Sequence, residues 1–113
     1  LNVWTNSIYL VKEIYEFTKE FPAIEKFGLA NQMCRAAISI PSNIAEGSSR
    51  TSIKEYLRFV EIALGSSYEL ETEIEIAYSI SYISETQYQK LIDSVVQIQK
   101  KLYMFAKRLR ESE

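Results

Sequence analysis

The 113-residue sequence contains no histidine, and this absence excludes more chemistry than any other feature. The chain lacks the usual ligands of zinc, the Glu-x-x-His pairs of di-iron bundles and the imidazole base of serine and cysteine triads. Its three glycines are far apart from one another, so there is no glycine-rich phosphate loop. Most classes of catalytic site are therefore excluded, and no cofactor is expected.

A metal site built from carboxylates alone is the one catalytic option that remains. It would use Glu46, Glu69 and Glu73. Arg35 and Arg50 are expected on the same polar side of the helices, where their charges would neutralise such a site. We therefore predict a protein that is not an enzyme and holds no metal.

Cysteine and long hydrophobic runs are equally scarce. Cys34 is the single cysteine, so no internal disulfide can form, and a reducing compartment suits the chain. No apolar run approaches the roughly 18 residues of a membrane span, and no basic-then-apolar leader opens the sequence. We expect a cytoplasmic protein with no membrane partner. The formal net charge of −2 also differs from the clearly basic balance of typical nucleic-acid-binding domains.

Helix-forming residues are abundant, and they are arranged in amphipathic segments. The hydrophobic periodicity predicts helices over about residues 3–19, 29–46, 52–81 and 85–110. A chain of this length supports one core, so residues 1–113 are predicted to form a single domain. Short connections favour antiparallel neighbours. The predicted fold is all-α, an up-down-up-down antiparallel four-helix bundle.

The apolar stripes predict which helix faces are buried. In the first helix the predicted stripe is Trp4, Ile8, Val11 and Tyr15, widened by Ile14, Phe17 and Phe21. The fourth helix carries a heptad seam of Tyr88, Val95, Leu102 and Leu109 with Leu91, Ile98 and Phe105. The third helix has two apolar stripes, and the second holds Phe59, Ile62, Leu70, Ile76 and Ile80. A helix that is apolar on two sides is buried on two sides. We therefore expect a homo-oligomeric ring built mainly from the second and third helices.

Proline and glycine mark three special positions. Pro41 removes a backbone donor within the second helix, but the apolar pattern keeps its phase on both sides, so a kinked continuous helix is predicted. Gly47, which two serines follow, is predicted to end that helix. Gly65 and Ser66 form a small-residue notch that either admits a neighbouring helix or is a packing defect.

A polar stripe follows the second helix at steps of four, four, three and four residues. Its members are Arg35, Ser39, Asn43, Glu46 and Arg50. One interpretation is a hydrogen-bond network that fixes the register against the third helix, where Arg35 would reach Glu69. The other interpretation is a ligand or RNA-phosphate contact through Arg35 and Arg50. The sequence leaves both open.

The end of the fourth helix is basic and has no acidic residue from position 100 to 110. Its cations are Lys100, Lys101, Lys107, Arg108 and Arg110. Basic residues at a helix C-terminus complement the helix dipole. They are also candidates for contact with nucleic acid, because Lys and Arg neutralise phosphates.

Three segments carry a family resemblance: FPAIEKFGL at 21–29, SIPSNIAEG at 39–47 and FVEIALGSSYELETEIEIA at 59–77. With them the chain resembles, from Leu1 to Ile83, the four-helix-bundle family linked to intervening sequences of bacterial 23S ribosomal RNA. Ser81 stands where the family pattern commonly has glycine. The resemblance implies a homopentameric ring. Related accessory subunits of diversity-generating retroelements bind nucleic acid and a reverse transcriptase.

These observations lead to one functional hypothesis and one alternative. The hypothesis is a non-enzymatic, homo-oligomeric scaffold or binding protein whose partners are copies of itself and RNA or another protein. The alternative is a nucleic-acid-binding accessory factor that acts with RNA or a reverse transcriptase. A carboxylate-dependent enzyme is a distant third.

Overall fold

The computed structural model describes residues 2–112, and within that range it contains helices and no strand. The α-helices are α1 (Asn2–Thr18), α2 (Leu29–Ser48), α3 (Ile53–Ser79) and α4 (Glu85–Glu111). A short 3-10 helix, η1 (Ala23–Phe27), lies between α1 and α2. The all-α prediction is confirmed, and each observed boundary lies close to the predicted one. No helix in this range is long and apolar enough to cross a membrane.

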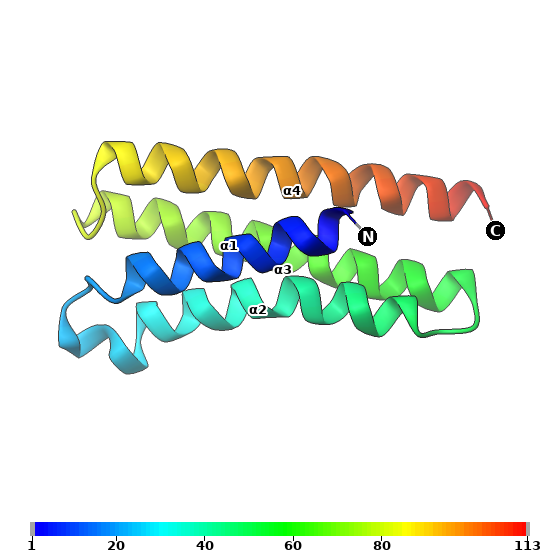
Figure 1. Ribbon diagram of the computed structural model, residues 1–113, viewed down its shortest axis with the longest axis horizontal. Helices are drawn as coiled ribbons and strands as arrows, with labels where there is room; N and C mark the ends of the chain where they lie inside the picture. Colours follow the sequence, from blue (N-terminus) through cyan, green and yellow to red (C-terminus); the bar gives the residue numbers. More distant parts are fainter. Residues whose placement is uncertain (1, 113) are drawn as a thin grey trace.

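Successive helices run antiparallel (Figure 1), and each packs against its neighbours in chain order. The first helix also packs against the last, while α1 and α3, like α2 and α4, lie diagonally opposite. The molecule is elongated, with extents of 46 × 24 × 19 Å. This arrangement fits the predicted up-down-up-down bundle.

The described helices differ in length. The first helix has 17 residues, whereas α3 and α4 have 27 each. At 1.5 Å per residue, α1 is about 15 Å shorter than either of them. The first described turn of α1 lies well inside the end at which α4 finishes (Figure 1).

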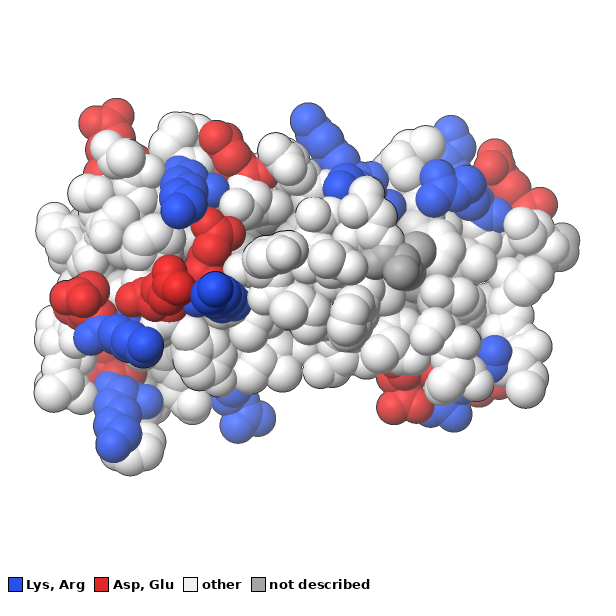
Figure 2. Space-filling model, in the orientation of Figure 1, with Lys and Arg blue, Asp and Glu red and all other residues white. Residues whose placement is uncertain are grey.

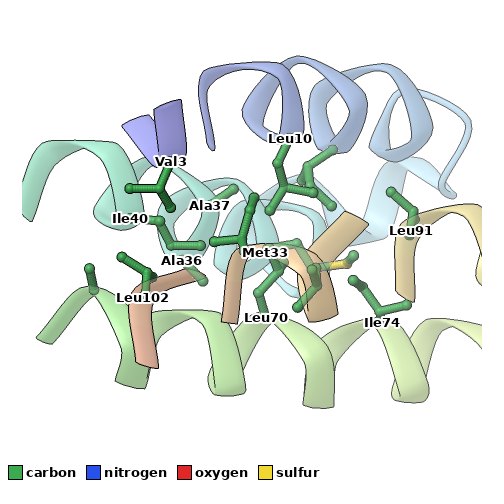
Figure 3. Close-up of a cluster of buried hydrophobic side chains, with 14 of the residues drawn as sticks. Val3, Leu10, Met33, Ala36, Ala37, Ile40, Leu70, Ile74, Leu91 and Leu102 are labelled. Atoms are coloured by element: carbon green, nitrogen blue, oxygen red, sulfur yellow. The ribbon is translucent and has the colours of Figure 1, made fainter. Parts of the chain in front are cut away.

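Large aliphatic side chains from all four helices meet along the centre (Figure 3). They include Leu10 of α1, Met33 of α2, Leu70 of α3 and Leu91 of α4, each at most 1% exposed. The heptad seam of α4 is confirmed, because Leu91, Val95, Ile98 and Leu102 are buried and Tyr88, Phe105 and Leu109 are half-buried.

The predicted core face of α1 is only partly correct. Ile14 is buried, and Val11 and Phe17 are half-buried against the core, but Trp4, Ile8 and Tyr15 are 40–44% exposed. The buried residues of α1 are Val3, Ser7, Leu10, Ile14 and Thr18. Two of these five residues are polar, so a pattern of apolar residues does not reveal the whole face.

Both buried hydroxyls of that face are satisfied within the helix itself. The Ser7 hydroxyl donates to the carbonyl of Trp4 at 2.7 Å, and that of Thr18 donates to the carbonyl of Ile14 at 2.8 Å. A hydroxyl bonded to its own backbone can be buried without a large desolvation penalty. The aromatic stripe is therefore left at the edge of the core.

The ends of α3 and α4 are fixed by local hydrogen bonds. Ser52 caps α3 by accepting from the Glu55 backbone N–H, and Ser84 forms a full capping box with Gln87. At the end of α3, Ser81 adopts a left-handed conformation with φ of 66°. The Tyr82 N–H bonds to the carbonyl of Ala77 at 2.8 Å, so the chain keeps a Schellman turn without the glycine.

The second helix is continuous through Pro41, and it ends at Ser48, within the Gly47–Ser49 segment that the sequence predicts to stop it. Gly47 itself is buried and faces α3. A Cβ at position 47 would lie 2.9 Å from side-chain atoms of both Tyr56 and Phe59. Gly47 is thus required for the close approach of α2 and α3. The two residues of the predicted notch differ: a Cβ at Gly65 would meet nothing within 4 Å, whereas the hydroxyl of Ser66 lies 2.8 Å from that of Ser39 on α2.

Alanine substitution should have opposite effects at these two glycines. We expect Gly47→Ala to lower the free energy of unfolding by about 1–3 kcal/mol, because the added methyl overpacks the α2–α3 contact. Gly65→Ala should raise it by about 0.5–1 kcal/mol, because alanine favours the helix and meets nothing. Chemical denaturation of both variants measures the two effects. A stabilising Gly47→Ala would contradict the close contact.

Candidate functional site

The polar stripe of α2 is divided into separate groups, and the first joins α2 to α3. The hydroxyls of Ser39 and Ser66 lie 2.8 Å apart. The Asn43 side-chain amide donates to the Ser39 carbonyl at 2.8 Å and to its hydroxyl oxygen at 3.0 Å. All three residues are half-buried. This group is a small packing network between the two helices.

The second group is an exposed ion pair at the end of α2. The Arg50 guanidinium donates to the Glu46 carboxylate at 2.7 Å, with the two side chains 39% and 50% exposed. The guanidinium also lies over the Phe59 ring, 4.9 Å from its centroid. A pair this exposed contributes about 0–1 kcal/mol. These two charges are therefore not part of a buried network.

Arg35 and Glu69 remain exposed but are brought to one place. They line a surface pocket of about 270 Å³ between α2 and α3, together with Gln32, Ser39 and Ser66. No ion pair joins the two charges among the described residues. The pocket thus presents the Arg35 guanidinium of α2 and the Glu69 carboxylate of α3 to solvent.

Glu73 is the buried carboxylate among residues 2–112, whereas the sequence named it only as one ligand of the conceivable carboxylate site. It is 5% exposed, and its Oε1 atom has no hydrogen-bond partner. Burial, together with the smaller effect of the nearby charge of Glu69, raises the pKa of Glu73 to about 7. The carboxyl is therefore poised between its neutral and ionised forms at neutral pH.

The alternating glutamates of α3 look alike in the sequence but have different surroundings. Glu71 accepts a hydrogen bond from the Gln99 amide of α4 at 2.7 Å. Glu75 accepts one from the hydroxyl of Tyr88, also on α4, at 2.9 Å to one oxygen. Glu69 is exposed, and only Glu73 is enclosed. The position of Glu73 between the buried Leu70 and Ile74 was the available signal.

No cluster of three or more carboxylate or thiol groups within residues 2–112 has the spacing to hold a metal ion. Glu46, Glu69 and Glu73, the three carboxylates of the conceivable metal site, have the separate surroundings described above.

The basic end of α4 contributes to a second pocket, of about 340 Å³, against the first turn of α1. It is lined by Asn2, Val3, Lys100, Lys101, Met104, Phe105 and Arg108. Of the other two predicted cations, Arg110 pairs with Glu61 of α3 at 3.1 Å, and Lys107 is exposed outside the pocket. Figure 2 shows blue side chains along the C-terminal half of α4, at the upper edge.

A third feature is an area without charge over α1 and α2, which we call the uncharged face. Figure 2 shows it as the broad white region in the centre. The partly exposed residues that define it are Trp4, Ile8, Tyr15, Ile38 and Ala45. The register of the two helices is fixed at one end by the contact of Thr18 with Cys34, at 3.6 Å. At the other end Trp4 and Ala45 line a common pocket.

Comparisons with known proteins agree with the fold. A family model described as 23S rRNA-intervening sequence protein matches residues 1–104. A crystal structure of a protein of unknown function from the S23 ribosomal protein family of Bacteroides thetaiotaomicron is similar, with a TM-score of 0.84 and 26% sequence identity. The similarity covers 93% of this chain and 98% of that one. No curated protein matches the sequence.

The basic end of α4 generates a prediction about RNA. Any single-stranded RNA bound there should be held by charge, without sequence preference. If four cations contact phosphates, affinity should fall about 50-fold when the salt concentration rises fourfold. Titration of a labelled RNA at two salt concentrations measures this.

Changing Lys100, Lys101, Lys107 and Arg108 to Met should abolish RNA binding. If the RNA affinity of this variant equals that of the parent, the RNA contact lies elsewhere on the chain, and Arg35 and Arg50 are the next candidates.

The buried carboxyl generates a prediction about pH. Because the pKa of Glu73 lies near 7 in the folded chain and at 4.5 when unperturbed, its ionisation opposes folding. Its contribution is most favourable below pH 4.5 and is lost as the pH rises through 7. Glu73→Gln should therefore raise the free energy of unfolding by up to about 3 kcal/mol at about pH 8, and little at pH 4.5.

Denaturant titrations at the two pH values measure this difference at a fixed protein concentration. Glu16→Gln, at an exposed position on α1, is the matched control and should change stability little at either pH. A Glu73→Gln protein that is no more stable than the parent at about pH 8 would show that the carboxyl is solvated.

Proposed function

The chain belongs to the family of 23S rRNA-intervening sequence proteins, and from that premise we propose that it is a non-enzymatic assembly protein that associates with copies of itself. The related structure from Bacteroides thetaiotaomicron is of a protein of unknown function. Support for the proposal therefore comes from the surface of this chain. We place the protein in the cytoplasm, where its single cysteine, Cys34, would remain reduced.

The uncharged face is the observation that carries the proposal. Trp4, Ile8 and Tyr15 of α1 and Ile38 of α2 are each 40–44% exposed. Charge enters the groove between α1 and α2 at its η1 end, where Lys19 and Lys26 line a pocket with Tyr15. The pocket at the other end, beside Trp4 and Ala45, is lined by uncharged residues. Large contiguous apolar patches are rare on monomers and commonly mark interfaces.

The α1–α2 surface supports self-association better than the second and third helices that the sequence favoured. The third helix does expose Ile62 and Ile76, at 40% and 45%. These isoleucines lie one heptad from the exposed Glu69 on each side, so a partner there would desolvate a carboxylate. A contact over the uncharged face has no such cost. The assembly we propose is a closed ring, a pentamer by the family resemblance.

A nucleic-acid role has less support from the surface. It would rest on the basic end of α4, where Arg110 is already paired with Glu61 and the Lys101 ammonium donates to the Asn6 amide oxygen at 2.6 Å. The acidic net charge of the chain opposes general phosphate binding. Self-association is therefore the better-supported function.

Placing charge on the uncharged face should dissociate the assembly. We expect the double variant Ile8→Glu/Ile38→Glu to sediment as a monomer at micromolar concentration, because burying two unpaired carboxylates in an interface costs several kcal/mol. Both side chains are partly exposed, so the monomer should keep its helical circular dichroism spectrum.

The matched control is Tyr103→Glu on α4, where the side chain is 54% exposed. It should leave the assembly intact. Ile62→Glu tests the alternative surface between α2 and α3. Dissociation by Ile62→Glu, with the Ile8→Glu/Ile38→Glu double variant still assembled, would move the interface to that groove.

A further inference from the structure

The pocket between α1 and α4 is a feature that self-association does not use. We call it the seam pocket. Its walls come from the first turn of α1, at Asn2 and Val3, and from three successive turns of α4, and its volume is about 340 Å³. Ligand pockets for small molecules begin at about 300 Å³, so this one is of a size for a small ligand.

Three cations surround the seam pocket without a carboxylate to neutralise them. They are Lys100, Lys101 and Arg108. None of them forms an ion pair with any carboxylate in the described part of the chain. The Lys101 ammonium bonds only to the neutral amide of Asn6. Three positive charges gathered at one opening favour an anionic group.

The remaining lining of the pocket is mostly hydrocarbon. Val3 is buried, Phe105 is half-buried, and Met104 is 45% exposed on the α4 side. The ring of Phe105 is held in a T-shaped contact with Tyr56 at 5.1 Å between centroids. These side chains would bury an apolar body placed beneath the three charges.

The same lining is unsuited to a nucleobase. Asn2 is the only uncharged polar residue among those that line the pocket. The polar edges of a base would therefore be buried without partners, which costs affinity. The Arg108 guanidinium also lies over the Phe105 ring, at 5.9 Å, and occupies a face on which a base could stack.

The first described turn of α1 and the C-terminal half of α4 bring this lining together. The α4 residues of the pocket lie against Asn2 and Val3. The spacing of 100, 101, 104, 105 and 108 puts these residues on one face of α4. The same face of α4 thus presents both cationic and apolar side chains to the seam pocket.

We propose that the seam pocket binds a small hydrocarbon anion, an aliphatic or aromatic body that carries one carboxylate or sulfonate. The acidic group lies among Lys100, Lys101 and Arg108, and the hydrocarbon covers Val3, Met104 and Phe105. This site is distinct from the uncharged face, and its occupancy does not depend on the oligomeric state.

A pair of fluorescent probes tests the proposal. The first is 8-anilinonaphthalene-1-sulfonate, an aromatic anion, and the second is N-phenyl-1-naphthylamine, which has the same kind of body without the charge. In the variant Lys100→Met/Lys101→Met/Arg108→Met, affinity for the anion should fall by about tenfold or more, since charge-assisted hydrogen bonds are lost. Affinity for the uncharged probe should change less than about twofold, because the methionines keep the apolar walls.

The matched control changes Lys12, Lys54 and Lys107 to Met, which removes the same amount of charge from exposed positions outside the pocket. It should bind the anion as the parent does. Met104→Glu places a carboxylate on the apolar lining of the pocket, and it should lower the affinity for both probes. Circular dichroism confirms that each variant is folded. Equal loss of anion binding in the control, or full retention in the Lys100/Lys101/Arg108 variant, would overturn the proposal.

Competition identifies the ligand class. At physiological salt, decanoate should displace the anionic probe, whereas decanol and adenosine monophosphate at the same concentration should not. Displacement by adenosine monophosphate as effective as by decanoate would mean that the pocket recognises phosphate rather than a hydrocarbon anion. Displacement by decanol as effective as by decanoate would mean that the cations contribute nothing.

Discussion

The close contact between α2 and α3 is the constraint on which the other surfaces depend. Gly47 leaves room for Tyr56 and Phe59, and the paired hydroxyls of Ser39 and Ser66 cross the same seam farther along. Small residues at these points let the backbones approach, so the large aliphatic side chains are directed to the centre. The α2–α3 hairpin then forms a long platform, and α1 and α4 pack against it and against each other.

The first helix contributes to both candidate surfaces. Its first described turn, at Asn2 and Val3, lies against α4 and lines the seam pocket. Because its core face includes Ser7 and Thr18, its aromatic stripe lies at the outer edge beside α2. The uncharged face and the seam pocket thus share α1.

The sequence predicted the helices well, since hydrophobic periodicity is a local signal. The buried face of α1 was predicted only in part, because the hydroxyls of Ser7 and Thr18 are satisfied by backbone carbonyls, which no pattern of apolar residues reveals. The isolation of Glu73 was missed because tertiary contacts, through Gln99 and Tyr88, provide partners for its neighbours and none for its Oε1 atom. The cations of α4 were predicted, but their position beside Val3 depends on the packing of α1 against α4.

The central claim is that the uncharged face is covered by another copy of the chain. The most direct test is the mass of the unmodified protein, measured by light scattering at micromolar concentration. The account predicts a mass at least twice the 13.1 kDa of one chain, and five times that mass if the resemblance extends to the pentameric ring. A mass of 13.1 kDa that does not change with concentration would contradict it, because the face over Trp4, Ile8 and Ile38 would then remain in water.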